Sequence, residues 1–128
     1  MNKRIILTAA ILGILAVSLG AFGAHALKAR VPAEALGLWK TGVEYHFYHT
    51  LALLFLGLVP AGNRRYVRIS SYCMLSGIVL FSGSLYLLAL RDVLGSGYGS
   101  ILGPITPIGG LLFILGWFYL ILAALKNK

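Results

Sequence analysis

The chain has 128 residues, a length that suits one domain and is short for two. It is 59% hydrophobic and 11% charged, with a mean hydropathy of +0.91. A soluble domain of this size lacks the interior to bury so much apolar surface. These values exclude a free soluble enzyme, a disordered tail and a secreted disulfide scaffold, and they predict a single transmembrane domain over residues 1–128.

The formal net charge of +8 would suggest a nucleic-acid partner on a soluble domain. Here the basic residues instead form short clusters between apolar runs, where charges set membrane topology and contact anionic headgroups. We therefore expect the lipid bilayer, and not nucleic acid, as partner. Cys73 is the only cysteine, so the chain cannot form an intrachain disulfide.

The first apolar run covers residues 5–27 and follows the basic pair Lys3-Arg4. Ala24-His25-Ala26 has the A-x-A form of a signal-peptide cleavage site. The run is nevertheless longer than the apolar region of a signal peptide and long enough to cross a bilayer. We expect it to be retained as a membrane helix.

Three more runs reach spanning length, at residues 43–61, 69–90 and 104–125. None alternates apolar and polar residues as barrel strands do. Between the first and second runs, Pro32 suits the first turn of a short helix over residues 33–39, with Trp39 at the headgroup level. The predicted fold is all-α: a four-helix integral membrane bundle with a short interfacial helix between helices 1 and 2.

Small residues recur within these runs and predict how the helices meet. They let helix backbones approach closely in lipid, where packing drives association. We expect tight packing within the chain in preference to a dimer face. The residues concerned are Ala16, Gly20 and Ala24 in the first run and Gly109, Gly110 and Gly116 in the fourth.

An even number of spans places both termini on one side of the membrane. That side carries Lys3, Arg4, Arg64, Arg65, Arg68, Lys126 and Lys128, whereas Glu34, Glu44 and Asp92 lie on the other side with fewer basic residues. The positive-inside rule then predicts both termini in the cytoplasm of a multi-pass inner (plasma) membrane protein. The Gly-rich connector 91–103 is predicted to be a mobile loop.

Polar side chains gather in the outer half of the predicted bundle, away from the termini. Because such groups are costly in lipid, they normally face the bundle interior or a cavity. We therefore predict an outward-opening polar pocket. Its candidate residues are His25, Glu44, Tyr45, His46, His49, Ser82, Ser84, Tyr86 and Thr106.

Three of these residues are candidate metal ligands. His46 and His49 are three residues apart and share one helix face, and His25 faces them from the neighbouring helix. Imidazole groups bind zinc, copper, iron or haem. The same histidines also suit interhelical hydrogen bonds or a proton relay, and the spacing does not choose among these roles.

No nucleophile motif accompanies Ser82 or Ser84, which favours a non-enzymatic protein. The leading interpretation is a packing or assembly partner, or a binder of a small ligand in the polar pocket. A haem or metal protein and an oligomeric channel or transporter are the alternatives. The sequence leaves open whether a homo-oligomer or another membrane protein is the partner.

Four ordered motifs together resemble a known family, the domain of unknown function 423, which includes transmembrane protein 256. The resemblance implies a four-helix integral membrane protein, assigned in bacteria to the inner membrane, with no accepted activity, substrate or cofactor. The family pattern includes the positions of His25, Tyr45 and His49. The motifs are Gly20-Ala21-Phe22-Gly23-Ala24-His25-Ala26-Leu27, Tyr45-His46 with His49, Phe81-Ser82-Gly83-Ser84-Leu85-Tyr86, and Thr106-Pro107-Ile108-Gly109-Gly110 with Gly116-Trp117.

Overall fold

The computed structural model describes residues 1–60, 63–95, 97 and 99–126, and within these residues all regular structure is helical. In chain order the elements are α1 (Lys3–Phe22), η1 (Gly23–Leu27), α2 (Ala33–Leu58), α3 (Arg64–Gly77), η2 (Ile78–Ser82), α4 (Gly83–Ala89), α5 (Arg91–Leu94) and α6 (Gly99–Leu125). The η segments are single π-helical turns. They continue their neighbours, so α1 extends into η1, and α3 extends through η2 into α4. The predicted all-α class is confirmed.

Local sequence signals explain where the long helices begin. The side chain of Asn2 accepts hydrogen bonds from the backbone N–H groups of Arg4 and Ile5, and so caps α1. Asn63 caps α3 in the same way through the N–H of Tyr66. Pro32 precedes α2 in an extended conformation, which suits a residue that offers no N–H to a helix. Each cap satisfies backbone donors that the helix itself leaves free.

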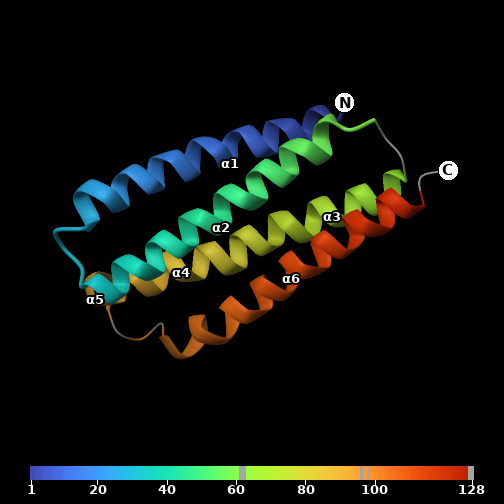
Figure 1. The fold of residues 1–128 in the computed structure, drawn as a ribbon. Coiled ribbons are helices and arrows are strands. Elements are labelled where there is room, and N and C mark those ends of the chain that lie inside the picture. The colour runs from blue at the N-terminus through green and yellow to red at the C-terminus, as the bar shows by residue number, and fades with distance from the viewer. Residues whose placement is uncertain (61–62, 96, 98, 127–128) are drawn as a thin grey trace.

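The long helices lie side by side along one axis, with both chain ends at the same end of the molecule (Figure 1). α1 packs mainly against α2, and α3 packs mainly against α6. α2 also contacts α3, η2 and α4, so it joins the two pairs. α2, which carries four of the nine candidate polar residues, therefore packs against helices of both pairs.

Three helices are long and apolar enough to cross a membrane: Lys3–Leu27, Arg64–Ala89 and Gly99–Leu125. The sequence predicts a fourth span at 43–61, and α2 is a helix there, but it is not among these three. The reason is its composition, because Glu44, His46 and His49 lower the hydropathy of its central part.

The connection between the first two helices differs from the prediction. Residues 33–39 form the first turns of α2 itself, so the separate interfacial helix is wrong. Trp39 is not at the surface but 3% exposed, and its indole packs where a side chain at Gly23 would otherwise lie. The helix continues without a break because residues 33–58 contain no proline.

The predicted Gly-rich loop after Leu90 is partly helical. α5 forms one turn over Arg91–Leu94, and Gly95 follows with a φ of 115°. That backbone conformation strongly favours glycine. Ser96 and Tyr98 of this connector lie outside the described residues, as do Ala61, Gly62 and Lys128 elsewhere in the chain.

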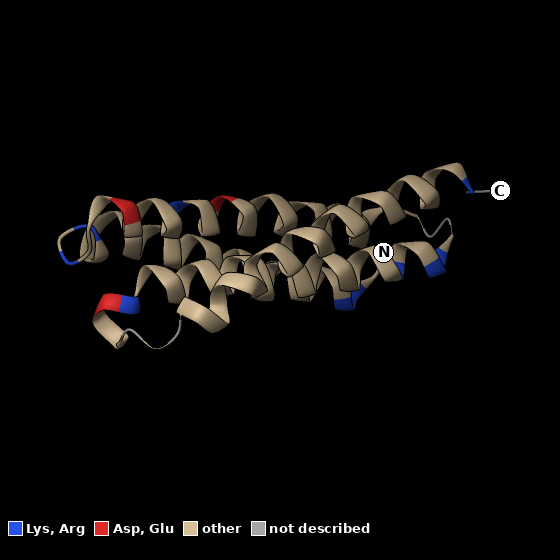
Figure 2. Ribbon diagram, turned by 90° about the horizontal axis from the view of Figure 1, so that it is seen from below, with Lys and Arg blue, Asp and Glu red and all other residues tan. Residues whose placement is uncertain are grey.

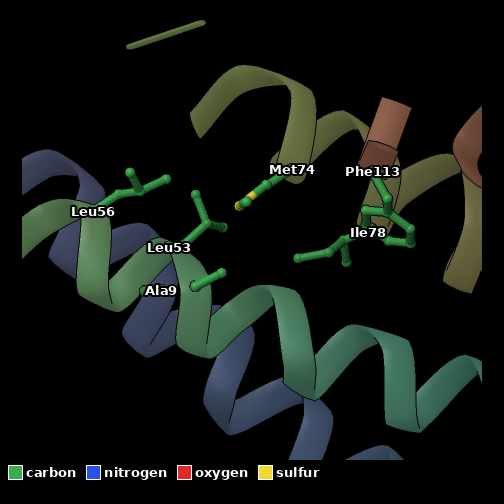
Figure 3. Close-up of a cluster of buried hydrophobic side chains, with 7 residues drawn as sticks. Ala9, Leu53, Leu56, Met74, Ile78 and Phe113 are labelled. Carbon is green, nitrogen blue, oxygen red and sulfur yellow. The ribbon is translucent and has the colours of Figure 1, made fainter. Parts of the chain in front are cut away.

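Buried apolar side chains form the core between the helices. Side chains from α1, α2, α3, η2 and α6 converge in one cluster (Figure 3), which consists of Ala9, Ala52, Leu53, Leu56, Met74, Ile78 and Phe113. A smaller cluster of Leu27, Trp39 and Ala89 lies toward the end of the molecule that is away from the two termini. The outward faces carry large exposed apolar residues such as Leu7, Ile14 and Ile114. An apolar exterior around a partly polar interior is what a membrane protein requires.

Charged residues are divided between the two ends of the molecule (Figure 2). The basic residues near the chain ends have no acidic residue beside them in the ribbon, whereas all three acids lie toward the opposite end together with other basic residues. The helices between the ends carry few charges. Such a division favours a bilayer around the middle of the molecule.

Candidate functional site

A hydrogen bond inside the bundle joins His49 of α2 to Trp117 of α6. His49 is 4% exposed, and its Nδ1 lies 2.7 Å from the carbonyl oxygen of Tyr45. The indole Nε1–H of Trp117 donates to His49 Nε2 over 3.1 Å. A carbonyl only accepts, so Nδ1 carries the proton and the geometry assigns a neutral ring. Both ring nitrogens of His49 are therefore satisfied within the protein.

Aromatic rings surround this contact. Phe113 of α6 stacks on the His49 imidazole with ring centroids 3.5 Å apart. Phe81 lies edge-on to Phe113 at 5.4 Å, and Tyr45 stands 4.8 Å from Phe81. The packing fixes the imidazole between rigid rings, which leaves the histidine little freedom to turn toward another partner.

A groove of about 740 Å³ opens between α2 and α6 beside these rings. It is mostly apolar and aromatic, and it is lined by Tyr45, Tyr48, His49, Phe81, Pro107, Gly110, Leu111, Phe113, Ile114 and Trp117. Tyr45 and Tyr48 are exposed, and among the hydrogen bonds of the described residues neither phenol has a partner. The groove thus offers flat apolar walls and two free hydroxyl groups.

His46 makes a different contact on the inner side of α2. Its Nδ1 lies 2.8 Å from the hydroxyl of Tyr86 on α4. Its Nε2 is buried near the backbone of Leu12 but makes no hydrogen bond to a described residue. Thr50, one turn further along α2, likewise holds a buried hydroxyl without a described partner. Two buried polar atoms of α2 thus lack a partner among the described residues, and Thr50 lies beside Gly13 of α1.

The serines and the threonine connect helices pairwise. Ser82 is fully buried and donates to the carbonyl oxygen of Gly42 over 2.7 Å. Ser84 lies 2.6 Å from the hydroxyl of Thr106 on α6. Hydroxyl groups that bond across helices are a common form of membrane-protein packing. These contacts tie η2 to α2 and α4 to α6.

His25 and Glu44 do not take part in these contacts. Both side chains are exposed, His25 on η1 and Glu44 on α2. Among residues 1–60, 63–95, 97 and 99–126, no three His, Cys, Asp or Glu side chains are grouped so that they could hold a metal ion. The three predicted metal ligands therefore do not form a ligand set in this structure, because His49 and His46 face different helices while His25 faces outward.

Comparison with known proteins identifies relatives of this chain. The profile of the family described as "Protein of unknown function (DUF423)" matches residues 19–110. The chain belongs to this family. It has full-length relatives: UPF0382 membrane protein YwdK of Bacillus subtilis is 44% identical over 97% of this chain and 98% of its own length.

A relative in Haemophilus influenzae, also a UPF0382 membrane protein, is 39% identical over the whole chain and 98% of its own length. A third, from Staphylococcus epidermidis, is 43% identical over 97% of both chains. No solved structure matches. The family and these names make the chain a membrane protein of a family of unknown function.

The DUF423 match contains all nine residues predicted from the sequence, but two important groove residues lie outside it. Phe113 and Trp117 were not predicted as site residues. Both lie on the fourth apolar run near Gly110 and Gly116, where small residues let another helix approach, and Trp117 also belongs to one of the quoted motifs. Aromatic residues are common in membrane helices, so these signals do not select these two.

Proposed function

We propose that this DUF423 protein is a non-enzymatic membrane protein that binds a small lipid-soluble molecule in the groove between α2 and α6. The observation that carries the proposal is the groove itself. Its volume of about 740 Å³ falls within the range of small-molecule sites. It also combines apolar walls with a small number of polar groups, as such sites do.

The lining suggests the chemistry of the ligand. The rings of Phe81, Phe113 and Trp117 present apolar surfaces on which a flat ring stacks. The hydroxyls of Tyr45 and Tyr48 have no described partner and are free to donate to a carbonyl oxygen. A planar molecule with carbonyl groups and an apolar tail, such as a quinone, has this combination. The bound pair His49–Trp117 would hold the wall rigid without bonding to the ligand.

We also propose a membrane topology. We infer that α2 crosses the membrane together with the three more apolar helices, because it packs along α1 with His46 and His49 turned inward. Both termini then lie in the cytoplasm, at the basic end of the molecule. Reporter tags at the two termini should both be found in the cytoplasm, and a periplasmic C-terminus would contradict a four-span arrangement.

The other functions considered for the sequence have less support. A haem or metal site of His25, His46 and His49 would require His49 to give up its bond from Trp117 and His25 to turn inward. An oligomeric channel or transporter needs a polar path through a span. Two buried atoms without a partner among the described residues, His46 Nε2 and the Thr50 hydroxyl, are what favours either alternative.

The chain offers an internal reporter for a test, since it has two tryptophans. In Trp39→Phe protein only Trp117 fluoresces, beside the groove, whereas in Trp117→Phe protein only Trp39 fluoresces, packed on Gly23. Titration of decyl-benzoquinone into nanodiscs should quench Trp117 saturably. The double variant Tyr45→Phe/Tyr48→Phe, made in the Trp39→Phe protein, should weaken the apparent affinity about tenfold because two hydrogen bonds are lost.

The Trp39 reporter separates binding from partitioning. A quinone that merely dissolves in the bilayer should quench both tryptophans to a similar degree and without saturation, and that result would reject the site. Saturable quenching of Trp117 that the tyrosine changes leave untouched would keep the groove and reject the role of the hydroxyls. Circular dichroism of each variant should show unchanged helix content.

A further inference from the structure

The end of the molecule that carries both termini holds a second cavity, separate from the groove between α2 and α6. Its volume is about 560 Å³, and it lies between the first turns of α1 and α3 and the end of α2. Lys3, Arg4, Arg64 and Arg68 line it, together with apolar side chains. No acidic residue is among its lining residues in the described part of the chain. The cavity therefore concentrates positive charge.

These cations have no partner within the described residues. The single ion pair found there joins Arg91 to Asp92, at the opposite end of the molecule. No described residue accepts a hydrogen bond from the guanidinium group of Arg4, Arg64 or Arg68. Like charges around one cavity raise each other's electrostatic energy, and an anion placed among them lowers it.

A narrower groove of about 210 Å³ leads from the same place along α1 and α3. It passes Thr8, Ser71 and Leu75 and is more apolar than the cavity. Arg4 and Arg68 line both spaces. The two arginines therefore stand where a charged cavity joins an apolar groove.

We propose that the cavity and the groove together bind an anionic phospholipid. Its phosphate would lie between Arg4 and Arg68, with the headgroup in the cavity and an acyl chain along α1 and α3. A phospholipid has the same order of parts: a polar head, a phosphate and an apolar chain. The planar guanidinium group suits phosphate because it offers two parallel N–H donors.

The surrounding helices favour a lipid over a soluble phosphate. The continuous helices Lys3–Leu27 and Arg64–Ala89 are both long and apolar enough to cross a membrane. The groove between them would therefore face acyl chains. Positive helix N-termini of α1 and α3 meet at the cavity, and each adds to the attraction for an anion. On the cytoplasmic side, basic sites between membrane helices bind anionic headgroups.

Native mass spectrometry of the protein released from mixed nanodiscs tests the proposal. The nanodiscs should contain phosphatidylglycerol and phosphatidylcholine with identical acyl chains. The wild-type protein should retain phosphatidylglycerol in preference, and Arg4→Gln/Arg68→Gln should reduce that preference about tenfold or more. The charge-matched control is Arg65→Gln/Arg91→Gln, since neither residue lines the cavity or the groove.

The possible results distinguish a specific lipid site from its alternatives. Equal losses in the two double variants would mean that general surface charge, and no site, attracts the lipid. Displacement by glycerol 3-phosphate as readily as by phosphatidylglycerol would mean that the ligand is a soluble phosphate ester. Should the glutamine variant lose helix content, Arg4→Lys/Arg68→Lys keeps the charge and removes the planar donors. It should weaken the preference about threefold, and an unchanged preference would overturn the arginine site.

Discussion

Some polar side chains at the two ends of the molecule have opposite roles. At the closed end, where η1, the first half of α2 and the η2–α4 segment pack, Ser82 and Tyr86 bond to neighbouring helices. At the basic end, where α1 and α3 begin and α2 ends, Arg4 and Arg68 line cavities and bond to no described side chain. Ser82 and Tyr86 therefore stabilise the fold, whereas the guanidinium groups of Arg4 and Arg68 are available to a ligand.

The difference follows from the solvent that surrounds each polar group. A hydroxyl group inside the bilayer has no water, so an unpaired one is costly and helix-to-helix bonds form. A guanidinium group at the headgroup level is solvated by water and lipid phosphate, and needs no partner from the protein. Removing the hydroxyl of Ser82 or Tyr86 should consequently destabilise the protein, whereas removing the guanidinium group of Arg4 or Arg68 should leave its stability almost unchanged.

The largest effect is expected at Gly109, where α6 meets η2. A Cβ atom there would overlap the backbone of Phe81, which cannot move aside as a flexible side chain does. Gly109→Ala should destabilise the protein by about 3 kcal/mol. Unfolding in detergent, followed by circular dichroism, measures this loss. Gly110→Ala is the matched control, because its Cβ would lie 3.7 Å from the Phe81 ring in ordinary contact.

Trp39 should come next. Its Nε1–H donates to the carbonyl oxygen of Leu19 over 2.8 Å, and its ring lies 4.7 Å from that of Tyr86. Trp39→Phe removes the donor and part of the contact, and should cost about 2 kcal/mol in the same unfolding measurement. Phe118→Leu, on an exposed face of α6, should change stability by less than about 0.5 kcal/mol. A Trp39 effect as small as that of Phe118 would contradict a buried anchor.

A smaller effect is expected for the bond between His46 and Tyr86. Tyr86→Phe keeps the ring and removes the hydroxyl, while His46→Leu removes the other partner. A double-mutant cycle of the two changes should give a coupling free energy of about 1 kcal/mol. Additive losses, with no coupling, would show that the two side chains do not bond in the folded protein.

Arg68 at the basic end should show the smallest effect. In a zwitterionic detergent without added lipid, Arg68→Gln should change the free energy of unfolding by no more than about 0.5 kcal/mol. A slight gain in stability is expected, since the change removes a charge that faces Arg4 and Arg64 across the cavity. A loss above about 1 kcal/mol would mean that the guanidinium group has a structural partner, and the contrast between the ends would fail.

Parts of the candidate site could be predicted from the sequence. Tyr45 and His49 line the groove, and both were candidates because polar groups on an apolar helix require a reason. The sequence could not show which of the nine candidates contact one another. The direction of each side chain depends on how its helix is rotated about the helix axis. His46 and His49 are close in sequence, yet one faces Tyr86 and the other Trp117.

The same limit explains the error at the start of α2. Trp39 has the amphipathic character of an interfacial anchor, and nothing local shows that it is buried. Its position depends on Gly23, sixteen positions away, where the missing Cβ leaves space for the indole. A contact between residues this far apart in sequence holds the start of α2 against η1.

The sequence by itself determined that this is an all-helical membrane protein and where its long apolar helices lie, because in lipid every backbone polar group must bond within its own segment. It also determined that basic residues collect at one end. Tertiary structure alone decided which polar side chains pair, that Trp39 is buried and that two arginines share a cavity. Those outcomes depend on the rotation and spacing of packed helices, which side-chain volumes at distant positions set together.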